Sequence, residues 1–299
     1  MVNRHVLAAG VVLAAVVWTY AGVMSSLVAQ WASDDNYSHG FIVLPIAALF
    51  AWERRERLRG ARPAPSPAGA ALVLVSLVLF ALGRLGAELF LTRVSLVGIV
   101  AGAVLFVWGR EHFRILLFPL AFLLLMIPLP AIVFNQIAFP LQLLASEVGE
   151  VAIASAGIPV LREGNILELP GTRLEVAEAC SGIRSLVSLL TLAIVLAHFS
   201  GPGPWRRVLI VASAVPIAIL ANAARVAGTG LTSHWLGEAA AQGFFHGFSG
   251  WLIFVVAFLA LLAVQRAVSG FRSPATRLLV TDSALASRRG GVATPSAGR

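Results

Sequence analysis

Long apolar segments alternate with short polar segments along the whole chain. Charge-free stretches cover residues 6–28, 63–83, 185–205 and 239–265. A helix needs about 20 apolar residues to cross the hydrocarbon core of a bilayer. Read together with their polar flanks, the apolar segments predict about eight membrane helices, at residues 6–28, 37–52, 66–83, 91–108, 114–128, 184–204, 207–227 and 247–265. The predicted fold class is an all-α polytopic membrane protein.

The composition supports a chain that lies mostly in lipid. Of the 299 residues, 59% are hydrophobic and only 12% are charged, and the mean hydropathy is +0.88. A soluble domain of this length could not bury that much apolar surface. The stretch 6–28 is longer than the apolar core of a signal peptide and lacks a small-x-small cleavage site, so we interpret it as a retained helix.

Arginines orient the predicted bundle. The net charge is +8 and the chain contains no lysine. Basic residues cluster at 53–59, 110–114, 206–207 and from 266 onward, which all fall on one side of an eight-helix bundle. Cytoplasmic loops carry such an excess of basic residues, so this side is the predicted inner face. Arg84 and Arg93 are exceptions on the outer side. Basic grooves with interleaved aromatics are not visible, which argues against nucleic-acid binding.

The largest predicted outer element is the segment 129–183. Its first part, 132–156, is a mostly apolar helix that carries Glu147 and Glu150; we favour a helix lying at the surface, with a ninth span as the alternative. Two short alternating runs at 166–169 and 174–176 flank a Pro-Gly turn and predict a β-hairpin that leads toward Cys180. Residues 1–268 then form one membrane-embedded domain, and residues 269–299 are predicted to be a disordered cytoplasmic tail.

Cys180 is the only cysteine of the chain and lies where a polar segment gives way to an apolar helix. The start of a helix favours an anion, because its first amides and its dipole are positive. Arg184 follows one helical turn later on the same face. Both features would lower the pKa of the thiol and increase the thiolate fraction. The alternative is a small, inert cysteine in helix packing.

Helix rise places further polar side chains at the same depth. Arg225 lies 18 residues beyond Arg207, which corresponds to about 27 Å along a helix. His246 lies 20 residues before Arg266, or about 30 Å. Arg184 lies 22 residues before the next inner arginine, or about 33 Å, with the cysteine one turn further out. All of them therefore reach the outer edge of a core about 30 Å thick; their lateral proximity is not set by this spacing.

Each of these side chains has a plausible chemical role at that edge. Arg225 lies away from the basic face, which favours a specific anionic partner over a snorkelling side chain, and Asn222 could hold its guanidinium or donate to a substrate. His246 could move protons, or instead cap and pack a helix end. His39 is a second outer histidine. The spacing required for a His/Cys metal site is absent, so neither a metal nor another cofactor is predicted.

The motifs that carry this chemistry resemble one known family. They are Ala179-Cys180-Ser181-Gly182-Ile183-Arg184, then Asn222-Ala223-Ala224-Arg225, then His246 followed by Gly250-Trp251, together with residues 37–40, 157–160 and 163–164. In order and spacing this combination resembles the exosortase/archaeosortase family over roughly residues 30–266. Histidine in the third motif is similar to the exosortase branch.

The resemblance implies a membrane cysteine transpeptidase without a cofactor. Its substrates would be secreted proteins with a C-terminal sorting tail of the PEP-CTERM type, composed of a Pro-containing motif, a membrane helix and a basic end. By the resemblance, Cys180 would form a thioester, His246 would transfer protons, Arg225 would stabilise the oxyanion or orient the motif, and Arg184 would support the thiolate. The enzyme would lie in the bacterial plasma membrane with its site facing outward, in association with exopolysaccharide and biofilm matrix export.

Other functions remain open at this stage. A transporter or channel would need polar groups near the bilayer midplane, whereas the charges here gather at one edge. The remaining alternatives are a non-catalytic component of the envelope export machinery and a membrane peptidase that only hydrolyses its substrate. The sorting motif, the acyl acceptor and the oligomeric state are not indicated by the sequence.

Overall fold

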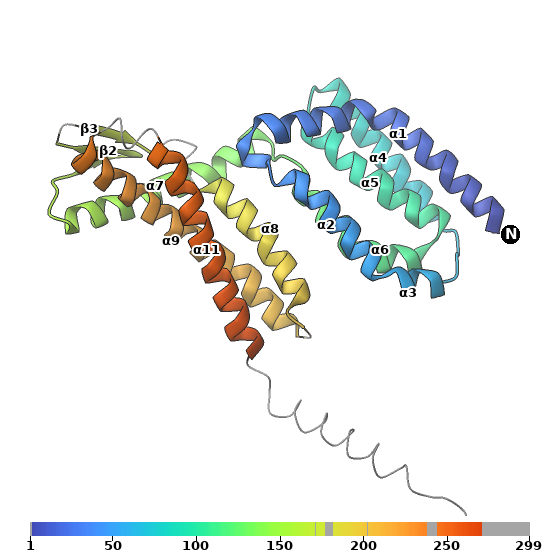
Figure 1. Ribbon diagram of the computed structural model, residues 1–299. Helices are drawn as coiled ribbons and strands as arrows, with labels where there is room; N and C mark the ends of the chain where they lie inside the picture. The colour runs from blue at the N-terminus through green and yellow to red at the C-terminus, as the bar shows by residue number, and fades with distance from the viewer. Residues whose placement is uncertain (1, 171, 177–181, 202, 238–243, 271–299) are drawn as a thin grey trace, which may run out of the picture. The chain divides into compact units, whose positions relative to one another are not determined.

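The computed structural model describes residues 2–170, 172–176, 182–201, 203–237 and 244–270 (Figure 1). Helices dominate it, and a small sheet is the only strand structure in these ranges. Among the described residues, five helices are long and apolar enough to cross a membrane, at 67–85, 89–107, 131–155, 204–235 and 248–269. The predicted fold class, an all-α polytopic membrane protein, is confirmed.

The chain divides into two compact units. One contains Met1–Leu144 and Ala177–Arg184, and the other contains Ala145–Val176 and Ser185–Arg299. The first unit is built from α1 (Val2–Ser33), η1 (Asp35–Tyr37), α2 (Gly40–Glu53), α3 (Arg55–Gly60), α4 (Pro67–Leu85), α5 (Leu89–Val107), α6 (Arg110–Phe122), η2 (Leu123–Met126) and the first part of α7 (Ala131–Ser155).

Small residues hold α4 and α5 together as an antiparallel pair (Figure 1). At Gly102 a methyl group would lie 2.9 Å from the backbone nitrogen of Val73, and at Gly98 it would lie 2.5 Å from Ser76 Oγ. These distances are shorter than van der Waals contact, so the two backbones approach closely only because side chains are missing. Membrane helices, which gain little from hydrophobic burial in lipid, associate through this kind of close packing.

Polar contacts attach α1 to α5 in the first unit. The hydroxyl of Tyr20 lies 2.9 Å from Ser95 Oγ. Arg93 is 3% exposed and donates to Gln30 Oε1 at 2.6 Å and to Ser26 Oγ at 3.2 Å. Arg93 was an exception to the arginine pattern. Its burial between two helices explains the exception, because a side chain with internal partners does not act as a topological signal.

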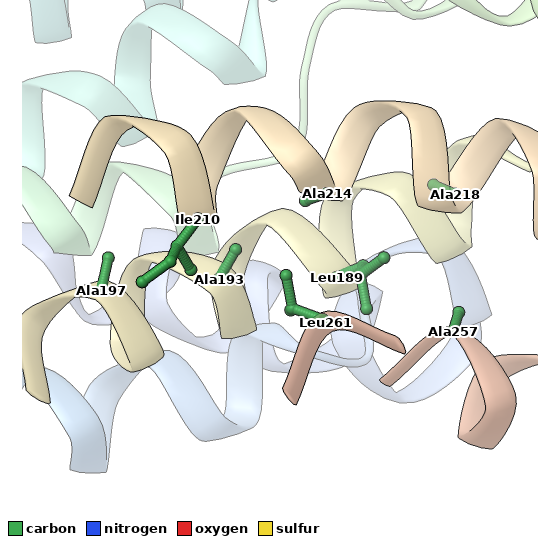
Figure 2. Packing of buried hydrophobic residues seen from close by; sticks show 8 residues of the cluster. All are labelled: Leu189, Ala193, Ala197, Ile210, Ala214, Ala218, Ala257 and Leu261. Atoms are coloured by element: carbon green, nitrogen blue, oxygen red, sulfur yellow. The ribbon is translucent and has the colours of Figure 1, made fainter. Parts of the chain in front are cut away.

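The second unit joins three helices through a core of small side chains. These helices are α8 (Ile183–Phe199), α9 (Pro204–Leu236) and α11 (Phe244–Gly270). Leu189, Ala193 and Ala197 of α8 meet residues of α9 and α11 in one buried cluster (Figure 2). The other members of the cluster are Ile210, Ala214, Ala218, Ala257 and Leu261. The three helices that carry or follow the predicted site motifs are therefore packed side by side in this part of the chain.

A three-stranded antiparallel sheet precedes α8 in the chain. Its strands are β1 (Leu161–Glu163), β2 (Ile166–Leu169) and β3 (Thr172–Glu175), in the order β1-β2-β3. The predicted hairpin of 166–169 with 174–176 is confirmed, with Leu167 opposite Leu174. The strand β1 was not predicted, because a three-residue strand with two charged side chains has no clear alternating pattern. Its only signal was the Gly164-Asn165 turn, where Gly164 has φ 66°.

The sheet and the end of α7 pack on the C-terminal part of α9. A methyl group at Gly149 of α7 would lie 2.8 Å from Val226 Cγ1, and one at Gly230 would lie 2.5 Å from Ile153 Cδ1. Arg162 of β1 donates to Glu150 Oε2 at 2.9 Å. Residues 145–176 therefore form a cap over residues 226–230, which lie beyond Arg225 along α9.

This packing corrects the predicted length of α9. The sequence predicted a helix at 207–227, whereas α9 runs from Pro204 to Leu236. Its last turns have buried small and polar residues, including Thr229 and Ser233, which lowered the hydropathy and hid the extension. Arg225 therefore lies three turns inside the helix rather than at its end.

The remaining predicted boundaries agree with the structure to within a few residues. The helix predicted at 114–128 is α6 followed by η2, and the helix predicted at 184–204 is α8, which ends at Phe199. The membrane domain was predicted to end at residue 268, and α11 continues to Gly270. Residues 271–299, which include nearly all of the predicted disordered tail, lie outside the described residues.

Candidate functional site

Arg225 lies at the contact between α9 and α11. A methyl group at Gly250 of α11 would be 3.2 Å from Nη2 and 3.3 Å from Cζ of Arg225. The guanidinium therefore packs directly against the backbone of α11 at a position without a side chain. Arg225 is partly exposed, while its neighbours Ala223 and Val226 are buried. The helix pair thus places one cation against α11 and leaves part of it accessible.

His246 occupies the first turn of α11, one helical turn before Gly250. Positions four residues apart share one face of a helix and are separated by about 6 Å of rise. Position 246 is therefore one turn from the point where Arg225 contacts α11. The backbone of His246 is described, but its side chain lies outside the described part of the structure.

Cys180 falls in the segment 177–181, which lies outside the described residues. The chain on its C-terminal side is described. Gly182 has φ 75°, a conformation that favours glycine, and α8 begins at Ile183, which is 1% exposed. The helix predicted to begin at residue 184 begins at Ile183, so this boundary is confirmed to within one residue. The expectation that Arg184 follows Cys180 by one turn on the same helical face is not met, because Gly182 has a left-handed conformation and α8 begins only after it. The position of the thiol and its distances to Arg225 and His246 stay predictions.

Arg184 pairs with an aspartate that the sequence did not single out. Its Nη1 lies 3.2 Å from Oδ2 of Asp35, and the two side chains are 44% and 77% exposed. An ion pair this exposed contributes about 0–1 kcal/mol to stability. The ion pair instead positions two segments of the chain, because it joins the η1 turn to the first turn of α8. A pair between residues 35 and 184 leaves no signal in local spacing, so the sequence did not indicate it.

Asn222 and Thr229 flank Arg225 on α9. Asn222 is 5% exposed, three residues before Arg225. Thr229 is also buried, and its hydroxyl donates to the backbone oxygen of Arg225 at 2.9 Å. Polar side chains therefore continue along the buried side of α9 on both sides of the arginine. The sequence predicted Asn222 as a supporting residue but missed Thr229, which lay beyond the predicted helix end.

His39 lies just before α2 and is 7% exposed. Its Nε2 is 3.1 Å from the backbone oxygen of Leu125 in η2. The described contact fixes the start of α2 against η2. A role for His39 in chemistry stays a prediction. The described residues contain no group of three His, Cys, Asp or Glu side chains that could hold a metal ion.

Comparisons with known proteins give one match. Searches of curated proteins and of solved structures returned no match. A family model described as transmembrane exosortase (Exosortase_EpsH) matches residues 31–263. The match covers most of the chain and includes Cys180, Arg184, Arg225 and His246. The chain is therefore a multi-pass membrane protein that belongs to the transmembrane exosortase family.

Proposed function

We propose that this protein is a cysteine transpeptidase that cleaves the C-terminal sorting tails of secreted proteins at the outer membrane–water interface. One observation supports the proposal most directly: the guanidinium of Arg225 packs on Gly250, one helical turn from His246. The three helices nearest the motif residues also share one buried cluster. A cation near the position of an imidazole suits acyl transfer, because one group can stabilise an oxyanion while the other moves a proton.

In the proposed first step, the thiolate of Cys180 attacks the carbonyl carbon of the scissile peptide bond. The carbonyl oxygen becomes an oxyanion in the tetrahedral intermediate. The C–N bond then breaks, His246 gives its proton to the leaving amine, and the acyl group remains on sulfur as a thioester. In the second step His246 takes a proton from water or from an amine of the envelope. This nucleophile attacks the thioester, and the thiolate is regenerated.

Arg225 is proposed to stabilise the oxyanion or to orient the motif of the tail. A fixed cation stabilises developing negative charge most strongly where water is excluded, because it needs no reorganisation during the reaction. The guanidinium of Arg225 is held by contact with a backbone rather than left on a free side chain. Arginine also presents several donors in one plane, which suits either an oxyanion or a carboxylate of the tail.

Arg184 is proposed to support the thiolate from the first turn of α8. Its positive charge, together with the positive end of the helix, would lower the pKa of the Cys180 thiol. The contact with Asp35 offsets part of that charge. Asp35 therefore adjusts how strongly Arg184 acts on the thiol.

The proposed setting is the bacterial plasma membrane with the site facing outward. The arginine clusters on the opposite side support this orientation. Substrate proteins would enter laterally through the bilayer with their own tail helix, and the scissile bond would meet the site at the outer edge. By family resemblance, the proteins processed would take part in exopolysaccharide and biofilm matrix export.

The decisive experiment uses the fact that the chain has only one thiol. A substrate with a Pro-containing motif, an apolar helix and an arginine cluster is co-expressed with the full-length protein, and tail removal is measured by mass. Cys180→Ala and His246→Ala should abolish removal while the protein remains inserted. His234→Ala removes a histidine in the last turn of α9 and should process normally. Undiminished processing by Cys180→Ala would refute the proposal.

A trapping experiment tests the covalent step separately. Hydroxylamine at neutral pH cleaves thioesters and should release the acyl product from the wild-type enzyme. The Cys180→Ser variant would form at most an ester, which resists the same treatment. Tail removal without any hydroxylamine-sensitive intermediate in the wild type would argue against nucleophilic catalysis by the cysteine.

A further inference from the structure

We propose that the arginine-lined cavity between α3 and α6 binds the phosphate headgroup of an anionic phospholipid. The cavity belongs to the first unit and has a volume of about 920 Å³. Arg57 of α3 and Arg110 and Arg114 of α6 line it, together with Ala64 and Pro65 of the loop before α4. The site lies outside the proposed catalytic machinery, so the inference does not depend on the proposed function.

The cavity carries an excess of positive charge, because three arginines and one glutamate line it. Arg57, Arg110 and Arg114 are exposed and form no ion pair with any described residue, although Glu111 also lines the cavity. Their neighbours on the same face behave differently. Arg55 and Arg59 lie 3.5 Å and 3.1 Å from Oε1 of Glu56. Three unpaired guanidinium groups that face one cavity favour an anion supplied from outside the chain.

The wall of the cavity is a built structure rather than a loose loop. Ala64 forms a β-bridge with Gly109 and donates from its backbone nitrogen to Trp108 O at 3.1 Å. Gly109 has φ 88° and ψ −171°, a region open almost only to glycine. A methyl group there would overlap the carbonyl oxygen of Ala64. The loop before α4 is therefore attached to the corner between α5 and α6, and this attachment holds the arginines around a preformed space.

The other residues that line the cavity indicate which class of anion it binds. Ala61, Pro67 and Ile115 add apolar surface beside the three arginines. Trp52, which is 64% exposed at the end of α2, lies under Arg55 at 5.3 Å, and exposed tryptophans of this kind mark the membrane–water interface. The site thus offers cations and apolar surface at interfacial depth. An anionic phospholipid combines a phosphate with a glycerol and acyl part, and basic pockets between membrane helices bind such headgroups.

The arginines of this face have a second, simpler interpretation, which the test must distinguish from lipid binding. Arginines on this face also orient the bundle, and for that role any exposed position serves equally well. A binding site instead requires the three arginines that line the cavity. The chain offers a matched control, because Arg55, Arg59 and Arg62 lie on the same face but do not line the cavity.

The experiment measures lipid binding by the full-length protein in mild detergent using native mass spectrometry. Phosphatidylglycerol and phosphatidylcholine are added separately to the wild type, to the triple variant Arg57→Gln/Arg110→Gln/Arg114→Gln, and to a control triple variant with Arg55, Arg59 and Arg62 changed to Gln. Each basic residue near an anionic surface contributes about fivefold to affinity. The cavity variant should therefore lose phosphatidylglycerol binding by on the order of a hundredfold, whereas the control changes it by less than about fivefold.

Three outcomes would overturn the proposal. Equal binding of the two lipids by the wild type would show that the headgroup charge is not recognised. Equal losses in the two triple variants would show that only the general charge of this face matters. Displacement of phosphatidylglycerol by an equal concentration of inorganic phosphate would identify a site for free anions rather than for a lipid.

Discussion

Replacement of Gly250 by alanine tests whether the position of Arg225 matters for the proposed chemistry. The new methyl group would lie 3.2 Å from Nη2 and 3.3 Å from Cζ of Arg225. Carbon atoms in contact prefer separations of about 3.5–4.0 Å. The guanidinium must therefore move away by a few tenths of an ångström. It can do so at little energetic cost, because it is the end of a flexible side chain.

The expected effects on stability and on activity have opposite signs. Alanine is favoured over glycine inside a helix by roughly 0.5–1 kcal/mol, so the variant should fold at least as well as the wild type. A misplacement of 1 Å at a catalytic site can lower the rate by about a hundredfold. A shift of a few tenths of an ångström should then lower kcat/KM by about three- to tenfold, and Gly250→Leu should approach the hundredfold loss.

The assay is tail cleavage by purified enzyme, measured as kcat/KM, with thermal stability measured in the same detergent. Gly228→Ala is the matched control. Gly228 lies in α9 close to Arg225, but a methyl group there would meet nothing within 4 Å. It should therefore provide a similar gain in helix stability without loss of activity. Full activity of Gly250→Ala and Gly250→Leu, or an equal loss in the control, would show that the contact between Arg225 and α11 has no role in the reaction.

Three further predictions address other parts of the structure. Asp35→Asn leaves the charge of Arg184 without its offset, so the single thiol should be alkylated a few-fold faster at neutral pH, while stability changes by less than about 1 kcal/mol. Gly109→Ala forces an unfavourable backbone conformation and overlaps Ala64, so the unfolding temperature in detergent should fall, by an amount that corresponds to at least 1–3 kcal/mol. In a background without the native thiol, a cysteine at Val151, which is 62% exposed on α7, should react with a membrane-impermeant maleimide; protection from the reagent would indicate a ninth span.

The sequence predicted those parts of the fold whose secondary structure follows from local composition and residue spacing. Each of the eight predicted apolar segments corresponds to a described helix. The hairpin at 166–169 and 174–176 was found because a Pro-Gly turn separates two alternating runs. Lipid requires every backbone group in a span to be satisfied within the helix, so hydropathy locates apolar helices. Among the described residues, four of the eight predicted spans are long and apolar enough to cross a membrane; the fifth such helix is α7, for which we favoured a surface position.

The parts that were missed depend on contacts between distant segments. The extension of α9 to Leu236 is stabilised by α7 and the sheet, through Gly149 and Ile153. The pairing of Arg184 with Asp35 joins residues 149 positions apart. Neither contact has a local signature, because each depends on which helices are neighbours. The same reasoning explains why helix rise yields a prediction of depth but none of lateral proximity.

The length of α9 explains why a site at this depth suits the proposed reaction. The helix has 33 residues and is about 50 Å long, whereas a hydrocarbon core is about 30 Å thick. Arg225 lies about 32 Å from the start of this helix. The residues that follow Arg225 pack beneath the cap formed by residues 145–176. A span that begins at Pro204 would therefore reach Arg225 near the far edge of the hydrocarbon core. A tail helix could remain in the bilayer up to that level, while its cleavable bond meets a fixed cation and an acceptor from the aqueous side.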